Sequence, residues 1–270
     1  MDDKSLLKGL ENLKKHYNKS EIIKSYENLR FSDLSGKIEH KITISFLNNL
    51  ITKYKSNNLL EIGIGPGRIT KDLVVFNKAF GVDYSNNMLE LTKKNVKNKK
   101  WRFFRASITK MPFNSKIFDM AISFRLIAHF NKKERELAYK EIKRVLMKKS
   151  LFVFDLGNVK YKKPLMVRIL LGMYRIFFKE KVNKLLPEIY NIKISLNELK
   201  EELNKFNFNI DKIYGINYYN SLVLLLLSIS KRLKNKSLLK LIEKIILNIE
   251  KNNQKNLNNY AEYIVVTRIN

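Results

Sequence analysis

Three glycines at alternate positions, Gly63, Gly65 and Gly67, give this chain its clearest candidate for a chemical site. They follow an apolar run that is typical of a buried strand and that contains Glu61. A glycine-rich turn after a strand lets the backbone approach a ligand closely, because no Cβ atom stands in the way. A helix predicted at residues 68–77 would add free backbone N–H groups at its start. Such turns lie at the carboxyl ends of parallel strands, where ligands bind, so the stretch predicts a site for a nucleotide-like cofactor.

The spacing of these glycines excludes two common nucleotide sites. The dinucleotide fingerprint G-x-G-x-x-G requires glycine or alanine three residues after its second glycine, and Arg68 occupies that position here. A phosphate-binding loop requires Lys followed by Ser or Thr, and the turn has no such pair. The turn is therefore expected to bind a different kind of cofactor.

His129 and Asp155 are two further candidates for chemistry. The pKa of histidine is ordinarily near neutrality, so His129 suits a general base. The alternative is a structural role in the loop before a helix predicted to start at Lys132. Asp155 ends another predicted strand at the ligand edge, where it either contacts a substrate or caps a loop or helix. No set of residues predicts a metal site.

Strand and helix patterns alternate around these candidates from residue 57 to residue 155. Ser85 is predicted to cap the helix that carries Met88. The five predicted strands cover residues 58–62, 79–83, 101–106, 118–124 and 151–155. Strands that alternate with helices form a doubly wound parallel sheet with right-handed crossovers. The fold class is therefore α/β.

Helical patterns flank this core on both sides. The N-terminal part predicts three helices, and Ser195 with Glu198 predicts a capping box at the start of a later helix. The other predicted elements are a helix at 38–54, an apolar helix with a narrow basic stripe at 165–178, an apolar-rich helical stretch at 221–249, and strands at 208–214 and 263–267.

The composition favours a basic, cytoplasmic protein. The chain of 270 residues has no cysteine, which excludes disulfides, thiolate metal sites and cysteine nucleophiles and fits a reducing compartment. Its longest uninterrupted apolar run, residues 222–227, is far shorter than the roughly 20 residues of a membrane-spanning helix. The net charge of +28 indicates either a polyanionic partner or the lysine-rich codon usage of an AT-rich genome.

Four blocks of the sequence, in their order and spacing, resemble those of class I S-adenosylmethionine-dependent methyltransferases. The similarity is greatest to the small-molecule branch that includes ubiquinone and menaquinone methylases, with its type 11 methyltransferase domain. It extends over about residues 15–155. The blocks span residues 61–67, 81–88, 106–113 and 124–130, and residues 141–146 resemble the helix before the fifth strand.

The resemblance implies that the three glycines make room for the methionine part of S-adenosylmethionine. Asp83 takes the place of an acidic residue that binds the ribose hydroxyls, and a carboxylate accepts two such hydrogen bonds well. Tyr84 and Met88 are expected to pack on the adenine. Ser107 stands where the family usually has an aspartate that binds the adenine amine. The full set of expected cofactor-binding residues is Glu61, Gly63, Gly65, Gly67, Asp83, Tyr84, Met88, Ser107, Ile108, Phe124, Tyr26 and Arg30.

Two of these residues precede the core. Tyr26 resembles a tyrosine of the family's N-terminal cap that lies over the cofactor, and the alternative is an ordinary core aromatic. Arg30 would pair with the methionine carboxylate.

The resemblance also implies a Rossmann-like, doubly wound sheet of seven strands, in which strands 1–5 are parallel and the last strand is antiparallel. The expected parts are an N-terminal helical cap at 1–55, a cofactor-binding core at 56–155, a helical insertion or lid at 156–190, and a C-terminal part of the sheet at 191–270 with a helical insertion at about 216–258.

The expected activity is methyl transfer to a small-molecule or lipid-like acceptor. Apolar helical faces rimmed by Lys and Arg would suit peripheral contact with an anionic membrane, and packing within a helical subdomain or between subunits is the alternative. Nucleic acid is a second acceptor class, although the chain reads Ser123-Phe124-Arg125-Leu126 where base-amine methylases carry an Asn/Asp-Pro-Pro-Tyr motif. A noncatalytic scaffold with the same fold is the remaining alternative.

Overall fold

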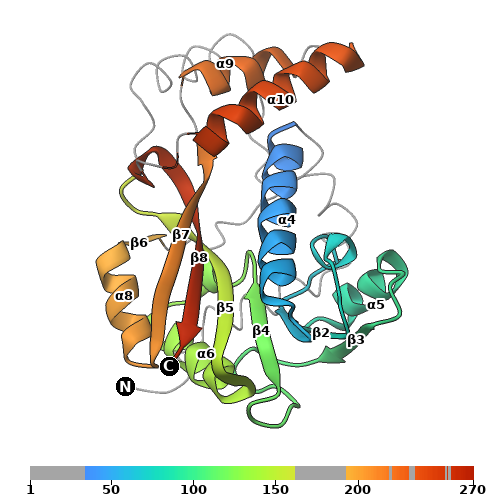
Figure 1. Cartoon of the computed structure of the whole chain (residues 1–270), viewed down its shortest axis with the longest axis vertical. Helices are drawn as coiled ribbons and strands as arrows, with labels where there is room; N and C mark the ends of the chain where they lie inside the picture. The colour runs from blue at the N-terminus through green and yellow to red at the C-terminus, as the bar shows by residue number, and fades with distance from the viewer. Residues whose placement is uncertain (1–33, 162–192, 219–220, 231–234, 253, 255–256) are drawn as a thin grey trace.

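The computed structural model describes residues 34–161, 193–218, 221–230, 235–252, 254 and 257–270, which form a mixed sheet with helices on both faces (Figure 1). The helices are α4 (Leu34–Tyr54), α5 (Asn86–Asn95), α6 (Lys132–Val145), α8 (Leu196–Asn204), α9 (Ser221–Ser230) and α10 (Lys236–Asn252). The strands are β1 (Asn58–Ile62), β2 (Lys78–Asp83), β3 (Trp101–Arg105), β4 (Phe118–Ser123), β5 (Leu146–Asn158), β6 (Lys193–Ile194), β7 (Phe208–Tyr218) and β8 (Tyr260–Ile269). Short 3₁₀ turns lie at Thr70–Asp72, Ile127–His129 and Leu257–Asn259.

The strands follow the order β3-β2-β1-β4-β5-β8-β7, and the two-residue β6 pairs with β5 outside this order. Strands β1 to β5 are parallel, whereas β8 runs antiparallel to both β5 and β7. The order changes direction between β1 and β4, which is where doubly wound sheets bind ligands. These observations confirm the predicted Rossmann-like sheet with an antiparallel last strand.

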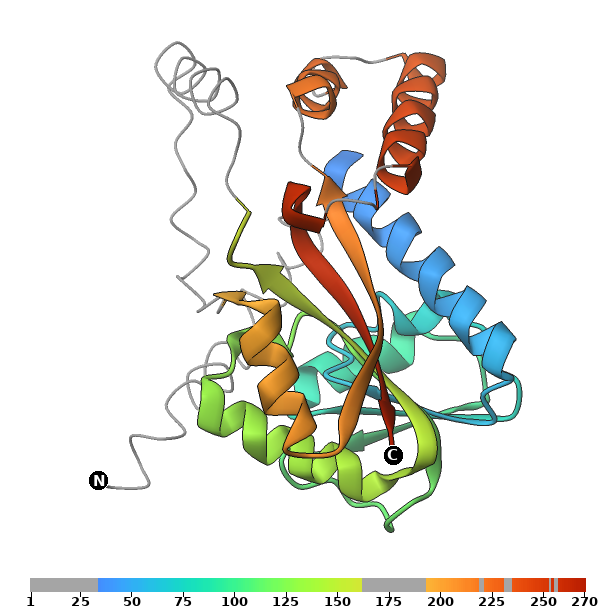
Figure 2. The same ribbon diagram turned by 60° about the vertical axis from the view of Figure 1, so that its left-hand side comes forward.

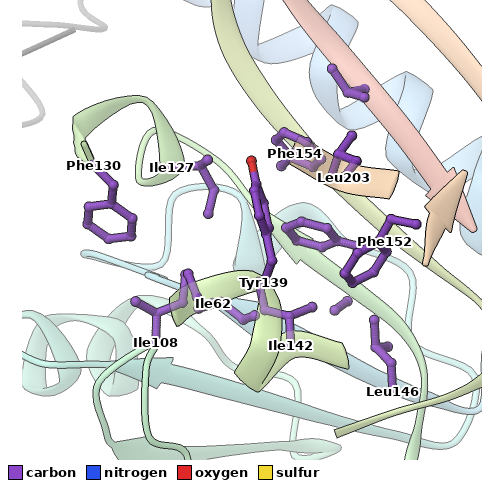
Figure 3. Packing of buried hydrophobic residues seen from close by; sticks show 14 of the residues in the cluster. Ile62, Ile108, Ile127, Phe130, Tyr139, Ile142, Leu146, Phe152, Phe154 and Leu203 are labelled. Atoms are coloured by element: carbon purple, nitrogen blue, oxygen red, sulfur yellow. The ribbon is translucent and has the colours of Figure 1, made fainter. Parts of the chain in front are cut away.

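Helices lie on both faces of the sheet (Figure 2). Two clusters of buried side chains attach them to it. Under α6 and α8, Tyr139 and Leu203 pack with Phe152 and Phe154 of β5 (Figure 3). On the opposite face, α4 contributes Leu47 to the second cluster. Alternate residues of a strand point to opposite faces, so β1, β2, β4, β5, β7 and β8 each contribute buried side chains to both clusters.

The loop after β4 is part of the first cluster. Ile127 and Phe130 are fully buried, and both lie among the core side chains of Figure 3. The next helix, α6, begins with a capping box between Asn131 and Glu134. This loop is therefore held at both its middle and its end.

The helix predicted at residues 68–77 is absent, and this prediction was wrong. The structure has only the 3₁₀ turn Thr70–Asp72 between β1 and β2. Helix α4 packs beside this connection, and Asn48 bonds to the carbonyl of Asp72 and the amide of Val74. The connection between β1 and β2 thus contains only a 3₁₀ turn. Helix α4, from an earlier part of the chain, packs where the crossover helix was expected.

Other elements were predicted with shorter bounds. Helix α4 begins four residues before the predicted start at residue 38, and β5 continues to Asn158, past the expected boundary at 155. Ser85 and Ser195 cap α5 and α8 as predicted. Tyr26, Arg30, the two earlier N-terminal helices and the helix at 165–178 lie outside the described residues.

The predicted helical stretch at 221–249 forms two helices, α9 and α10, that pack on each other and on α4 (Figure 1). None of the helices in the described ranges is long and apolar enough to span a membrane.

Candidate functional site

The glycine turn after β1 has a backbone that few other residues adopt. Gly63, Gly65 and Gly67 have φ angles of +75°, +54° and +80°. A Cβ atom on Gly63 would lie 2.6 Å from Cδ2 of Leu126, whereas one on Gly65 would meet no atom within 4 Å. Gly63 is therefore required by close packing, and Gly65 borders open space. The turn predicted from the glycine spacing is present.

Asp83 links this turn to the end of β2. Its Oδ2 accepts a hydrogen bond from the Gly65 amide at 2.9 Å, and its Oδ1 accepts one from the Ser85 amide at 2.9 Å. Burial raises the pKa of Asp83, while these amide donors lower it. A carboxylate can accept further bonds at each oxygen, so Asp83 can hold both the turn and a ligand.

A pocket opens at the carboxyl ends of β1, β2 and β4. The predicted residues that line it are Glu61, Gly63, Gly65, Asp83, Tyr84, Met88, Ser107, Ile108 and Phe124. Sequence positions from Glu61 to Phe130 thus meet around one cavity. Arg68, Arg125, Leu126 and Phe130 line it as well.

Gly67 and His129 are the described members of the predicted set that do not line this pocket. Gly67 lies against α5, where an added Cβ would be 3.1 Å from Cγ2 of Thr92. The Thr92 hydroxyl donates to the carbonyl of Gly65 at 2.6 Å, so α5 supports the turn from outside the pocket. His129 is buried in the 3₁₀ turn after β4. Its role as a base stays a prediction.

Two lining residues on the β2–β3 side already contact neighbours. The ring of Tyr84 lies beneath the Arg105 guanidinium, whose Cζ is 5.4 Å from the ring centre. Ser107 shares a hydrogen bond of 3.0 Å with the Thr109 hydroxyl. The Ser107 hydroxyl, which was predicted to face the adenine, is therefore paired with the hydroxyl of Thr109.

Glu61 is buried in the wall of the pocket. Its Oε2 has no hydrogen-bond partner within the described part of the chain. Burial raises the pKa of Glu61 to about 8. A buried carboxyl oxygen without a partner is costly, and a donor or a positive charge on a ligand would complete this site.

We expect Glu61 to make stability depend on pH. Because its pKa is raised on folding from 4.5 to about 8, the folded state holds a proton that the unfolded state has lost. Stability is therefore greatest below pH 4.5 for this group and falls as the pH rises through about 8. As the pH rises from 6 to 8, the free energy of unfolding of Glu61→Gln, measured with urea, should increase by about 2 kcal/mol relative to that of the wild type.

Glu90→Gln replaces an exposed carboxyl and is the control: its free energy of unfolding should change with pH as that of the wild type does. The same pH dependence in Glu61→Gln and the wild type would contradict the raised pKa of Glu61.

Arg68 approaches the pocket from the α4 side. Its Nη1 lies 2.8 Å from Nδ1 of His40, whose Nε2 lies 2.7 Å from Oδ2 of Asp72. Burial lowers the pKa of His40, which favours the neutral ring. A neutral ring can accept from Arg68 and donate to Asp72, so α4 orients the Arg68 guanidinium. In the sequence, Arg68 served only to exclude the dinucleotide fingerprint, and its place in the pocket was not predicted.

Arg125 is the centre of a charged network that sequence reasoning missed. Its Nη2 lies 2.5 Å from Oε1 of Glu39 on α4, and its Nη1 lies 2.9 Å from Oε1 of Glu262 on β8. Its backbone amide donates to Oδ1 of Asp155 at 2.7 Å, so Asp155 caps the loop after β4. Asn217 on β7 donates to the second oxygen of Glu39.

The network contains more acidic than basic groups. Burial raises the pKa of Asp155 to about 6 and that of Glu262 to about 7, although Arg125 opposes both shifts. Burial acts in the same direction on Glu39, but there the Arg125 and Arg68 guanidinium groups and the Asn217 amide together outweigh it, and the pKa is lowered. Arg125 has a φ of +58°, a conformation that is unfavourable for a residue with a side chain. The surrounding carboxylates therefore hold Arg125, and with it the loop that borders the pocket.

Comparison with known proteins agrees with this arrangement. A family model described as a methyltransferase domain matches residues 60–154. No curated protein matches the sequence.

Three solved structures share the fold at low sequence identity. A SAM-dependent methyltransferase of Thermotoga maritima, described as a possible histamine N-methyltransferase, is 16% identical with a TM-score of 0.55, and the match covers 93% of this chain and 97% of that one. Magnesium protoporphyrin IX methyltransferase of Synechocystis with bound SAH is 10% identical with a TM-score of 0.60, over 96% and 98% of the two chains. A SAM-dependent methyltransferase of Archaeoglobus fulgidus is 16% identical with a TM-score of 0.53, over 85% and 94%.

Proposed function

We propose that the chain, in which residues 60–154 match the family model of a methyltransferase domain, transfers a methyl group from S-adenosylmethionine to a small-molecule or lipid-like acceptor. The observation that carries the proposal is the meeting of the glycine turn, Asp83 and Glu61 around one pocket. These groups come from the ends of β1 and β2, which lie side by side in the sheet.

The residues present fit this cofactor. The open space beside Gly65 accepts a bulky group, and Asp83 retains acceptor capacity for two ribose hydroxyls. The unpartnered oxygen of Glu61 suits the positively charged amino group of the methionine part, and Arg68 suits its carboxylate. Met88 and Ile108 supply apolar surface for the adenine.

When bound, S-adenosylmethionine supplies a methyl group on a sulfonium that is already activated for attack. The protein therefore needs chiefly to hold the acceptor in line and to exclude water. Leu126 and Phe130, in the loop after β4, give the pocket an apolar wall. We assign the acceptor to this side of the pocket. A hydroxyl acceptor would also need a base, for which His129 is the predicted residue.

The test is calorimetric titration of the full chain with S-adenosylhomocysteine, the demethylated product. We expect Asp83→Ala to weaken binding at least about 100-fold, because the variant loses the ribose acceptor and the bond that holds Gly65, at about 1.4 kcal/mol for each factor of ten.

Asp119→Ala is the matched control. Asp119 also accepts two backbone N–H bonds, from Asn57 at 2.8 Å and Asn58 at 3.0 Å, but it lies at the amino end of the strands. Both variants should lose stability, and only Asp83→Ala should lose binding. Absence of binding by the wild type, or equal binding by both variants, would refute the proposed function.

A further inference from the structure

Helix α10 lies on the pocket side of the sheet. Strand β7 is antiparallel to β8, which is antiparallel to β5, so β7 ends at the same edge as the parallel strands. Helix α9 begins three residues after β7 and leads to α10. The two helices stand beyond this edge in both views of the molecule (Figures 1 and 2).

Helix α10 has more apolar surface than its contacts use. Its buried face presents Ile242 and Ile246 to α4 and α9. Leu238, Leu241 and Ile245 are spaced three and four residues apart, so they share another face. Their side chains are 41%, 52% and 38% exposed. Three large apolar side chains in one row are more than the isolated exposed hydrophobic residues that protein surfaces ordinarily carry.

The exposed charges of α10 all have one sign. Lys236, Lys240 and Lys244 are exposed, as is Lys251 near the end of the helix. Both acidic residues of the helix face inward. Glu243 forms an ion pair with Lys41 of α4, and Glu250 accepts a bond from the Asn217 amide at 2.5 Å.

We propose that the α10 surface, formed by Leu238, Leu241 and Ile245 with Lys240 and Lys244, docks on an anionic lipid membrane. An interfacial helix combines an apolar row that enters the lipid with lysines that reach the anionic headgroups. Lys244 lies three residues from Leu241, so the basic and apolar side chains are neighbours on the helix.

Two other partners fit the α10 surface less well. A second copy of the chain would bring its own lysines against these lysines, with no exposed acidic residue on α10 to pair with them. Nucleic acid is attracted by lysines, but a row of Leu and Ile offers no stacking ring and no hydrogen-bond donor to it. The docking does not depend on the methyltransferase activity, and its test does not measure that activity.

The experiment is co-sedimentation of the full chain with vesicles. Vesicles of phosphatidylcholine with phosphatidylglycerol are compared with phosphatidylcholine alone, at low salt and at 0.5 M NaCl. We expect binding to the anionic vesicles and little to the neutral ones. Leu241→Gln/Ile245→Gln and Lys240→Glu/Lys244→Glu should each reduce the partition coefficient at least about tenfold.

The controls make matched changes elsewhere on the surface. Val74→Gln/Leu137→Gln replaces two side chains of similar exposure, 40% and 45%, and Lys97→Glu/Lys99→Glu makes the same change of charge. Both should bind vesicles nearly as the wild type does.

Three results would overturn the proposal. The first is a partition coefficient on anionic vesicles that the α10 variants and the control variants lower by the same factor. The second is a self-association in free solution, seen by sedimentation velocity, that Leu241→Gln/Ile245→Gln abolishes, because the surface would then join two copies. The third is binding to single-stranded RNA that Lys240→Glu/Lys244→Glu weakens while vesicle binding stays unchanged.

Discussion

The Arg125→Gln substitution is expected to lower the free energy of unfolding by up to about 3–5 kcal/mol, the usual cost of removing one partner from a fully buried ion pair, since the Arg125 side chain is 25% exposed. The variant leaves Glu39, Asp155 and Glu262 without the guanidinium that contacts all three. Urea unfolding measures the loss. It should be greater at pH 8 than at pH 5, because at pH 5 Asp155 and Glu262, with pKa values of about 6 and 7, are already protonated in the folded state.

Two comparisons separate the network from general effects of losing an arginine. Arg102→Gln removes an exposed arginine of β3 and should change stability by less than about 0.5 kcal/mol. Glu262→Gln in the Arg125→Gln background should restore part of the loss, because it removes one uncompensated carboxylate. Additive effects of the two substitutions would show that the groups do not act together.

The Gly65→Ala substitution is expected to abolish most cofactor binding while the fold persists. Its φ of +54° costs an alanine about 1–2 kcal/mol, and the new methyl group would meet no protein atom within 4 Å. That open space is the space we assign to the cofactor. Calorimetry with S-adenosylhomocysteine should show affinity at least about tenfold lower, or about 1.4 kcal/mol.

Gly63→Ala is the informative contrast for this prediction. Its Cβ would lie 2.6 Å from Cδ2 of Leu126, at a φ of +75°, so stability and binding should both fall. Thermal unfolding should therefore rank Gly63→Ala below Gly65→Ala. Unchanged binding by Gly65→Ala would show that the cofactor does not use the space beside Gly65.

The elements that the sequence predicted well depend on local signals. The spacing of the glycines predicted a turn with positive φ angles, which few other residues can adopt. Asp83 could be placed because it is the last residue of a strand that the sequence pattern predicts. The caps at Ser85 and Ser195 need only a side chain and an amide three residues later. Alternating strand and helix patterns then predicted the doubly wound sheet, because parallel neighbours require a crossover between them.

Tertiary contacts decided the rest. The helix expected after the glycine turn is replaced by a 3₁₀ turn that packs beneath α4, and α4 comes from an earlier part of the chain. Glu39, Asp155 and Glu262 meet Arg125 from positions far apart, and a surface glutamate has the same local sequence signal as a buried one. The sequence by itself determined the glycine turn, and its resemblance to a methyltransferase family indicated the class of cofactor. Only the folded chain decided which charges hold the wall of the pocket, because ion pairs between distant segments depend on how the sheet and helices pack.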